Sequence, residues 1–147
     1  MYGNTKKIAE AIAGVLASSN EVKMALADEM DKFDFKAINL FLVGSPTQGG
    51  APSLKLKKAL EKIPVDALNG VKVAVFDTRF LEKDQNFALR LLIKIIGYAA
   101  PRIAKMLQDK GGQLVAAPEG FIVEKKEGPL KAGELERAAS WAQNLNF

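Results

Sequence analysis

The pattern of hydrophobic and polar positions predicts helices that alternate with strands. In four segments the apolar residues recur every three or four positions, which is the spacing of one buried helix face. The longest of these segments contains Gly97 and Pro101, so we expect a kinked helix there, or two helices that meet near Ala99–Pro101. The four predicted helices are Asn4–Ala17, Ser53–Lys62, Asn86–Lys110 and Glu134–Asn144.

Strand-like segments lie between these helices. One alternates apolar and polar residues, one is almost continuously apolar, and one is rich in β-branched residues. Strands separated by helices predict an α/β fold, in which a doubly wound parallel sheet has helices on both faces and one domain spans residues 1–147. The predicted strands are Val22–Ala27, Ile38–Gly44, Val71–Phe76, and then Leu114–Ala117 and Phe121–Val123 as two strands or as one broken at Pro118–Gly120.

The amino-acid composition excludes several kinds of catalytic and metal site. The chain has 147 residues, of which 48% are hydrophobic and 26% charged, and it contains neither Cys nor His. Thiol nucleophiles, disulfides, imidazole bases and zinc sites built on Cys or His are therefore excluded. The net charge of +4 suits an acidic partner and falls short of a nucleic-acid-binding stripe.

No transmembrane segment is predicted, because Arg90 and Lys94 interrupt the apolar stretch Phe87–Ala100. With no secretory signal either, we expect a cytoplasmic protein.

Three segments next to predicted strands or helices carry candidate chemistry. The first is Met1–Thr5, directly before the first helix. Gly3 allows a ligand to approach the backbone, and the amides of Asn4, Thr5 and Lys6 are helix-start donors that suit a phosphate. The alternative is that Asn4 or Thr5 simply caps the helix.

The second segment is the predicted loop Ser45–Ala51, which follows the most apolar strand. Two adjacent glycines after a proline allow backbone conformations that other residues avoid, and such a loop can offer amides and carbonyls to the edge of a flat ring. An ordinary connection to the helix after Pro52 explains the same residues. The candidate residues are Pro46, Thr47, Gln48, Gly49 and Gly50.

The third segment is the start of the predicted loop Thr78–Asp84, together with the Asp before it. Its candidate residues are Asp77, Thr78, Arg79 and Phe80. A surface ion pair between Asp77 and Arg79, with Phe80 folded under the loop, is the structural alternative to ligand binding.

Taken in order, these motifs resemble those of the flavodoxin family over nearly the whole chain. Each motif is weak alone, whereas their order and spacing together are specific. The matching segments are Tyr2–Thr5 with Ile8–Ala9, Val43–Gly50, Val73–Arg79, Glu127–Leu130 and Gly133–Ala138.

The resemblance implies noncovalently bound FMN, electron transfer through it, and the family's strand order 2-1-3-4-5. By the same resemblance, Tyr2 to Thr5 would hold the phosphate and Thr47 to Gly50 would line the flavin ring. A carbonyl in Gly49–Gly50 could accept a hydrogen bond from the reduced flavin. Asp77 to Phe80 would flank the other side, with Phe80 as the candidate for ring stacking.

The chain also departs from the family pattern. It begins inside the phosphate loop, so strand 1 of the fold is absent from this sequence. A missing N-terminal segment, a segment from another chain, or a rearranged sheet would each account for this. The segment Thr47–Gly50 has no aromatic residue, which predicts an open flavin face. Flavodoxins are usually acidic, so we expect Arg79 and nearby lysines to give a less negative reduction potential. The apolar stretch Phe87–Ala100 is a candidate core helix, homodimer surface or docking surface for a partner or a lipid-soluble acceptor.

The leading prediction is an FMN-bearing electron carrier with acidic redox proteins or a quinone as partners. The alternative is an enzyme, an NAD(P)H- or quinone-linked flavin reductase on the same fold. A phosphoacceptor signalling domain would use Asp77, but the sequence shows no acidic cluster beside it that would hold Mg²⁺.

Overall fold

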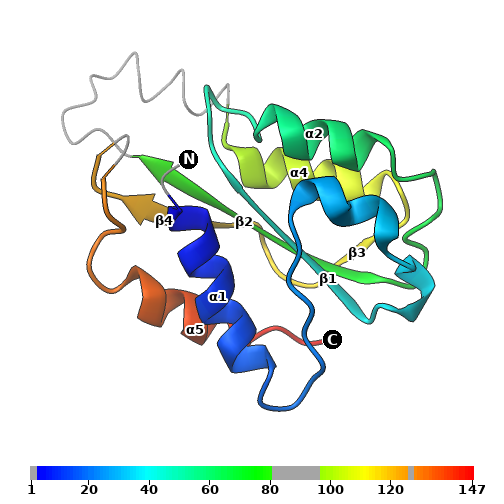
Figure 1. Ribbon diagram of the computed structural model, residues 1–147, viewed down its shortest axis with the longest axis horizontal. Helices are drawn as coiled ribbons and strands as arrows, with labels where there is room; N and C mark the ends of the chain where they lie inside the picture. Colours follow the sequence, from blue (N-terminus) through cyan, green and yellow to red (C-terminus); the bar gives the residue numbers. More distant parts are fainter. Residues whose placement is uncertain (1–2, 81–96, 126–127) are drawn as a thin grey trace.

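A parallel β-sheet forms the middle layer of the protein, and helices cover both of its faces (Figure 1). The computed structural model describes residues 3–80, 97–125 and 128–147. The helices are α1 (Asn4–Leu16), α2 (Leu54–Glu61), α4 (Ala99–Gln108) and α5 (Glu134–Gln143), with short 3₁₀ helices η1 (Ala27–Lys32) and η2 (Phe35–Ala37). The strands are β1 (Leu40–Pro46), β2 (Lys72–Phe80), β3 (Gln113–Leu114) and β4 (Glu119–Val123).

β2 is the central described strand. β1 runs parallel along one edge of it, with Val43 beside Val75. β3 and β4 both pair in parallel with β2, and β4 places Phe121 beside Thr78. The α/β class with a parallel sheet is confirmed. The full order 2-1-3-4-5 is not, because the described strands supply only its last three positions.

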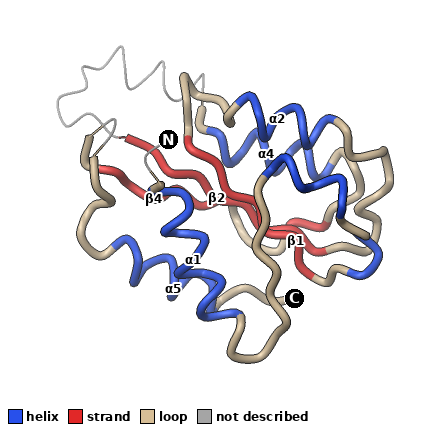
Figure 2. Tube along the Cα trace, viewed as in Figure 1, coloured by secondary structure: helices blue, strands red, loops and turns tan. Residues whose placement is uncertain are grey.

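Two hydrophobic clusters hold the layers together. One lies between the sheet and α2, α4 and η1, and it includes Val43 and Val75. The other lies between the sheet and the pair α1 and α5, where Phe76, Phe121 and Trp141 meet edge to face. Figure 2 shows the two helix pairs on opposite sides of the strands. Trp141 of α5 thus packs against strand residues of the sheet.

Several predicted elements are confirmed with small shifts of their ends. α1, α2 and α5 match their predicted ranges, and Ser53 caps α2 by accepting a hydrogen bond from Leu56 N–H at 3.4 Å. Residues 113–123 form two strands, β3 and β4, which is one of the two predicted alternatives, although β3 ends at Leu114 instead of continuing to Ala117. A helix does begin at Ala99. It follows Gly97, which has a left-handed backbone conformation, and Tyr98, which is extended. The predicted helix before it, like most of Phe87–Ala100, lies outside the described residues.

Two predictions about strands and loops were wrong. Val22–Ala27 is not a strand: its first five residues have no regular secondary structure, and Ala27 begins η1. The residues Asp77 to Phe80 are not the start of a loop, because β2 continues through them and pairs with β4. The loop predicted from Ser45 begins only after Pro46, since β1 extends to that residue. Within the described residues, no helix is long and apolar enough to cross a bilayer.

Candidate functional site

The start of α1 lies beside the carboxyl ends of β2 and β4 (Figure 1). Gly3 precedes the helix in a left-handed conformation, with φ of 72°, and no side chain caps the helix start. The first helical hydrogen bond runs from Lys7 N–H to the Gly3 carbonyl, at 3.0 Å. The amides of Asn4, Thr5 and Lys6 therefore stand ahead of the helical ladder, where an anion can accept from them.

Asn4 and Thr5 do not cap their own helix; both side chains reach across to other segments. The Asn4 amide Nδ2 donates to the Gly128 carbonyl at 2.7 Å. The hydroxyls of Thr5 and Thr78 lie 2.7 Å apart and share a hydrogen bond. The helix start is thus fixed to the end of β2 and to the chain before α5. The first turn carries no acidic residue, so nothing there repels a phosphate.

The segment after β1 is anchored to the same place. Thr47 N–H donates to the Thr78 carbonyl at 2.9 Å, which extends the β1–β2 ladder by one residue. The Thr47 hydroxyl accepts a hydrogen bond from Ala99 N–H, at 3.0 Å, at the start of α4. Thr5, Thr47 and Thr78 therefore gather at one end of the sheet, although they lie far apart in sequence.

Gln48 to Ala51 form a tight hairpin turn. Gln48 N–H donates to the Ala51 carbonyl at 2.9 Å, and Ala51 N–H returns to the Gln48 carbonyl at 3.1 Å. The two central residues, Gly49 and Gly50, have φ of 56° and 76°. Positive φ at both central positions is what a type I′ turn requires, and glycine meets it without strain. The conformational freedom expected of this glycine pair is confirmed.

Asp77 points into the protein. Its side chain is fully buried, and its two oxygens bind Arg79 Nε at 2.6 Å and Nη2 at 2.8 Å. The same carboxylate accepts from Ala100 N–H at 2.8 Å and so caps α4. Both oxygens are engaged, which leaves Asp77 poorly suited to a phosphoacceptor role.

Arg79 is held between two further groups. Its guanidinium carbon lies 3.6 Å from the centre of the Tyr98 ring. On the other side, a Cβ atom at Gly120 would run into the guanidinium group, so the backbone of β4 approaches it closely. The pair of Asp77 and Arg79 is real, but it is a buried ion pair rather than the expected surface one.

The remaining predicted site residues are less central. Met1 and Tyr2 lie outside the described residues. Phe80 ends β2, pairs with Val123 and is partly exposed. Sequence reasoning missed the contributions of Tyr98, the α4 amides and the Gly128 carbonyl. Only the α4 start had a signal, in the predicted helix junction near Ala99; the other contacts depend on tertiary structure.

These residues define an α/β protein in which an uncapped helix start and a glycine turn are both tied, through Thr78, to the end of a parallel sheet. In such folds, ligands bind outside the carboxyl ends of the strands. A family model described as flavodoxin matches residues 1–78, which is more than half of the chain. The chain therefore belongs to the flavodoxin family, a family of flavin-binding electron-transfer proteins with FMN as cofactor. No curated protein matches the chain.

Solved structures share the fold at low sequence identity. Flavodoxin 2 from Bacillus cereus is 23% identical with a TM-score of 0.66, covering 97% of this chain and 90% of that one. A flavodoxin from the domain Archaea is 19% identical, with a TM-score of 0.67 and coverage of 97% and 87%. The flavodiiron protein from Giardia intestinalis is 18% identical, with a TM-score of 0.69, covering 99% of this chain and 33% of that protein.

The described residues suit FMN. The phosphate needs donors without a competing anion, and the first turn of α1 offers three amides and two threonine hydroxyls nearby. A flat ring needs backbone close by and little side-chain bulk. A Cβ atom at Gly3 or Gly49 would meet nothing within 4 Å, so the surface at both glycines is open.

Proposed function

We propose that this protein is an electron carrier that holds FMN noncovalently at the carboxyl ends of β1 and β2. The observation that supports it most directly is the hydroxyl contact between Thr5 and Thr78, which fixes the free amides of α1 beside the end of the sheet. Bound FMN supplies a centre that accepts and releases electrons one at a time. The protein supplies binding, orientation and charge.

In this proposal the phosphate binds at residues 1–5, with the amides of Asn4 and Thr5 and the Thr5 hydroxyl as donors. The helix dipole of α1 adds favourable charge at the same point. The flavin ring lies against Pro46 to Gly50, where the turn exposes backbone groups. Thr78, near the end of β2, borders the site on the other side. Asp77, Arg79 and Phe80 support this side of the site, with Asp77 and Arg79 acting through the position of α4.

The reduction potential is a separate expectation of the proposal. The sequence predicts a less negative potential than that of an acidic flavodoxin, partly because of Arg79. In the structure Asp77 lies against that guanidinium, so the two charges largely offset each other at a distance. Any less negative reduction potential must therefore come mainly from the nearby lysines and from the dipole at the start of α1. A redox titration of the FMN complex measures it, and a strongly negative potential would reject this part of the proposal.

The test of the proposal is a fluorescence titration of the chain with FMN and with riboflavin. Free flavin fluoresces, and close contact with protein quenches it. FMN binding at least tenfold tighter than riboflavin binding is the expected result, because only FMN carries the phosphate. Equal affinities would place the ligand away from α1, and no quenching with either ligand would reject the proposal.

The enzyme alternative, an NAD(P)H- or quinone-linked flavin reductase, makes a different prediction. It requires turnover of NAD(P)H by the FMN-loaded chain when a quinone is present, whereas a carrier exchanges electrons with protein partners. Acidic redox proteins suit the net charge of +4. The last two residues of the segment Phe87–Ala100 do not support a homodimer through it, because Ala99 and Ala100 are buried within the chain itself. Its other residues lie outside the described part, and a cytoplasmic location stays a prediction.

A further inference from the structure

Thr47 is the first residue after β1, and its polar groups tie β1 to two other elements. Its N–H donates to the Thr78 carbonyl at 2.9 Å, which fixes its backbone to the end of β2. Its hydroxyl oxygen accepts from Ala99 N–H at 3.0 Å, at the start of α4. A hydroxyl also has a proton to donate, and no described residue accepts the proton of Thr47. The hydroxyl oxygen is therefore held in place, while its proton is available to a ligand.

The start of α4 has no free amide among its first three residues. Ala99 N–H donates to Thr47. Ala100 N–H donates to the buried Asp77 carboxylate at 2.8 Å, and that carboxylate is already offset by its ion pair. The third residue, Pro101, has no N–H. The partial positive charge at the N-terminus of α4 therefore reaches a ligand through the Thr47 hydroxyl, because a hydroxyl that accepts a hydrogen bond becomes a stronger donor.

Two other hydroxyls lie at this end of the sheet, and they are arranged differently. Those of Thr5 and Thr78 lie 2.7 Å apart and bond to each other, so one of them uses its proton within the protein. That pair lies beside the start of α1, which we assign to the phosphate. Thr47 directly precedes the glycine turn, which we assign to the flavin ring. Its hydroxyl therefore belongs to the ring side of the site.

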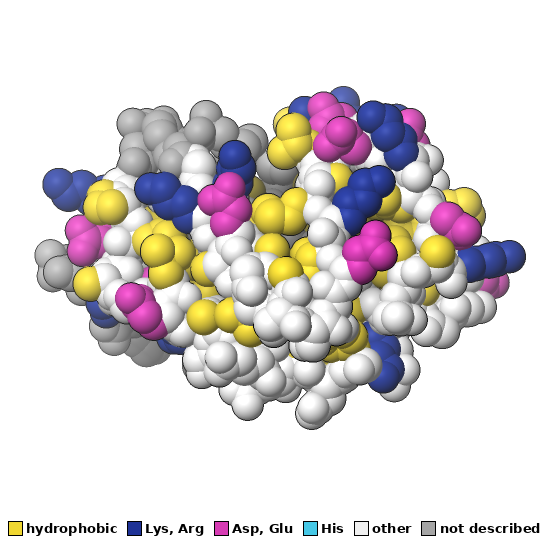
Figure 3. Space-filling model, turned by 60° about the horizontal axis from the view of Figure 1, so that its bottom comes forward, with side chains coloured by type: hydrophobic (Ala, Val, Ile, Leu, Met, Phe, Trp, Pro, Cys, Tyr) yellow, Lys and Arg dark blue, Asp and Glu magenta, His cyan; other side chains and the backbone are white. Residues whose placement is uncertain are grey.

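Charged side chains on the surface offset one another and act weakly on a distant ring. Figure 3 shows Lys and Arg side chains beside acidic ones on the face in view. Exposed pairs of this kind are Lys57 with Glu61 and Lys105 with Asp109. At physiological salt, exposed charges more than about 8 Å apart are also largely screened. A donor that contacts the ring acts without such screening.

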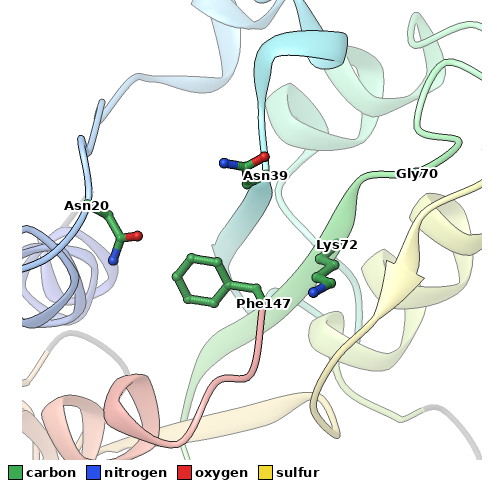
Figure 4. Close-up of a pocket in the computed structure, with 5 residues that line it drawn as sticks. All are labelled: Asn20, Asn39, Gly70, Lys72 and Phe147. Carbon is green, nitrogen blue, oxygen red and sulfur yellow. The ribbon is translucent and has the colours of Figure 1, made fainter.

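A cavity lies at the opposite end of the sheet, away from the ring site. It has a volume of about 210 Å³, and Figure 4 shows the residues that line it, among them Asn39 just before β1 and Lys72 at the start of β2. Lys72 lies six residues before Thr78, which is roughly 20 Å along an extended strand. The charge of Lys72 is therefore too far away to act strongly on a ring beside Thr47.

We propose that the Thr47 hydroxyl, polarised by the start of α4, donates a hydrogen bond to the ring edge of bound FMN and makes its reduction potential less negative. This role rests on the proposed function, because it requires FMN at the carboxyl ends of β1 and β2. The ring edge of a flavin carries oxygens and nitrogens that accept hydrogen bonds, and reduction adds negative charge to the ring. A fixed donor therefore binds reduced FMN more tightly than oxidised FMN. This contribution adds to those of the nearby lysines and of α1.

Titration of the FMN complex with dithionite, beside a reference dye of known potential, tests the proposal. Thr47→Val removes the hydroxyl and keeps the shape of the side chain. It should weaken the binding of reduced FMN relative to oxidised FMN at least tenfold, which makes the two-electron potential about 30 mV more negative. Thr47→Ser keeps the hydroxyl and should restore the potential. An unchanged potential in Thr47→Val would overturn the proposal, because a hydroxyl that only holds α4 in place affects both forms of FMN equally.

Ser53→Ala is the matched control, because it removes the hydroxyl that caps the neighbouring helix α2. It should lower the melting temperature and leave the potential unchanged. An equal shift of the potential in Ser53→Ala would assign the effect to a loosened helix start and would also overturn the proposal. A chain that binds no FMN at all would reject the proposed function and this role together, whereas FMN binding with an unchanged potential would reject only this role.

The amide signal of Ala99 gives a second measurement on the unmodified chain, which does not depend on how a variant folds. When a hydroxyl donates to a ligand, its oxygen accepts more strongly, and the amide proton that it holds moves downfield. NMR should therefore show the Ala99 amide proton moving downfield when FMN binds and further when FMN is reduced. Ala100, which donates to Asp77 instead, should move less than half as far. Equal movement of both amides, or none, would contradict a hydrogen bond from Thr47 to the ring.

Discussion

Asp77 and Arg79 face the same side of β2 and form a two-point ion pair, with N–O distances of 2.6 and 2.8 Å. Residues two apart in a strand share a face, so the local geometry brings them together. The carboxylate also caps α4 through Ala100 N–H. One buried side chain thus links the end of β2 to the start of the next described helix.

Replacing Asp77 with Asn should destabilise the protein strongly. The carboxylate is fully buried and the Arg79 side chain is 16% exposed, so the variant leaves a largely buried guanidinium without its counter-charge. Breaking one side of such a pair costs about 3–5 kcal/mol. Urea denaturation of Asp77→Asn measures the loss. Asp109→Asn, which breaks the exposed pair with Lys105, should change stability by less than about 1 kcal/mol. Equal effects of the two variants would show that the buried pair contributes no more than a surface one.

Replacing Thr5 with Val should weaken FMN binding selectively. The variant removes a hydroxyl that lies between the α1 amides and Thr78 and that we assign to the phosphate. Hydrogen bonds to charged groups contribute about 1.5–3 kcal/mol, which corresponds to a loss of roughly 10- to 100-fold in affinity. Flavin fluorescence titration measures it. Riboflavin affinity should stay the same, as should FMN affinity in the control Ser140→Ala on α5; a parallel loss for both flavins would assign Thr5 a purely structural role.

Replacing Gly49 with Ala should lower stability through the backbone alone. Its φ is 56°, and a Cβ atom there would meet nothing within 4 Å. The left-handed conformation costs an ordinary residue about 1–2 kcal/mol. Gly14→Ala is the control, because Gly14 lies inside α1 in equally open space without positive φ. That variant should stabilise the protein by about 0.5–1 kcal/mol. Thermal or urea unfolding that gave both variants the same sign would contradict the type I′ turn.

Stability should fall in acid partly because of Glu134. Burial alone would raise the pKa of Glu134, but hydrogen bonds from Arg137 and Ile122 N–H, with the charge of Arg137, hold that pKa below its ordinary value. Below about pH 4.3, the ordinary value for Glu, the unfolded chain binds more protons than the folded one. The contribution of Glu134 is therefore complete above that pH and is lost as the pH falls through the folded pKa. Urea midpoints from pH 3 to pH 7 measure it.

Glu134→Gln should reduce the pH dependence of the free energy of unfolding in that range. Glu10→Gln is the matched control, because Glu10 pairs with Lys6 on the exposed side of α1. It should leave the slope nearly unchanged. A Glu134→Gln variant with the same slope as the original protein would show that other carboxylates account for the acid dependence.

Much of the fold can be predicted from local patterns. β1 and α2 follow from a continuous apolar run and from a helical repeat with a serine cap, and neither depends on distant residues. Val22 to Leu26 show the limit of this reasoning. Their alternation predicts a strand, but a strand also needs a partner to receive its hydrogen bonds, and no described strand pairs with them.

The end of β2 shows the opposite error. Asp77, Thr78 and Arg79 are polar and so predict a loop. Asp77 and Arg79 neutralise each other inside the protein, while Thr78 bonds to Thr5, so all three are compatible with a buried strand. The glycine turn was predictable because φ is a local property. The gathering of three threonines was not, because it depends on how α1, β1 and β2 meet.

Backbone NMR of the full chain during an FMN titration tests the central claim most directly. The account predicts the largest shift changes at the amides of Asn4, Thr5, Gly49, Gly50 and Thr78, with little change along α5, which packs beside α1. Riboflavin should reproduce the changes at Gly49 and Gly50 but not those at Asn4 and Thr5. Changes confined to other parts of the chain, or no change at saturating FMN, would contradict a flavin site at the carboxyl ends of β1 and β2.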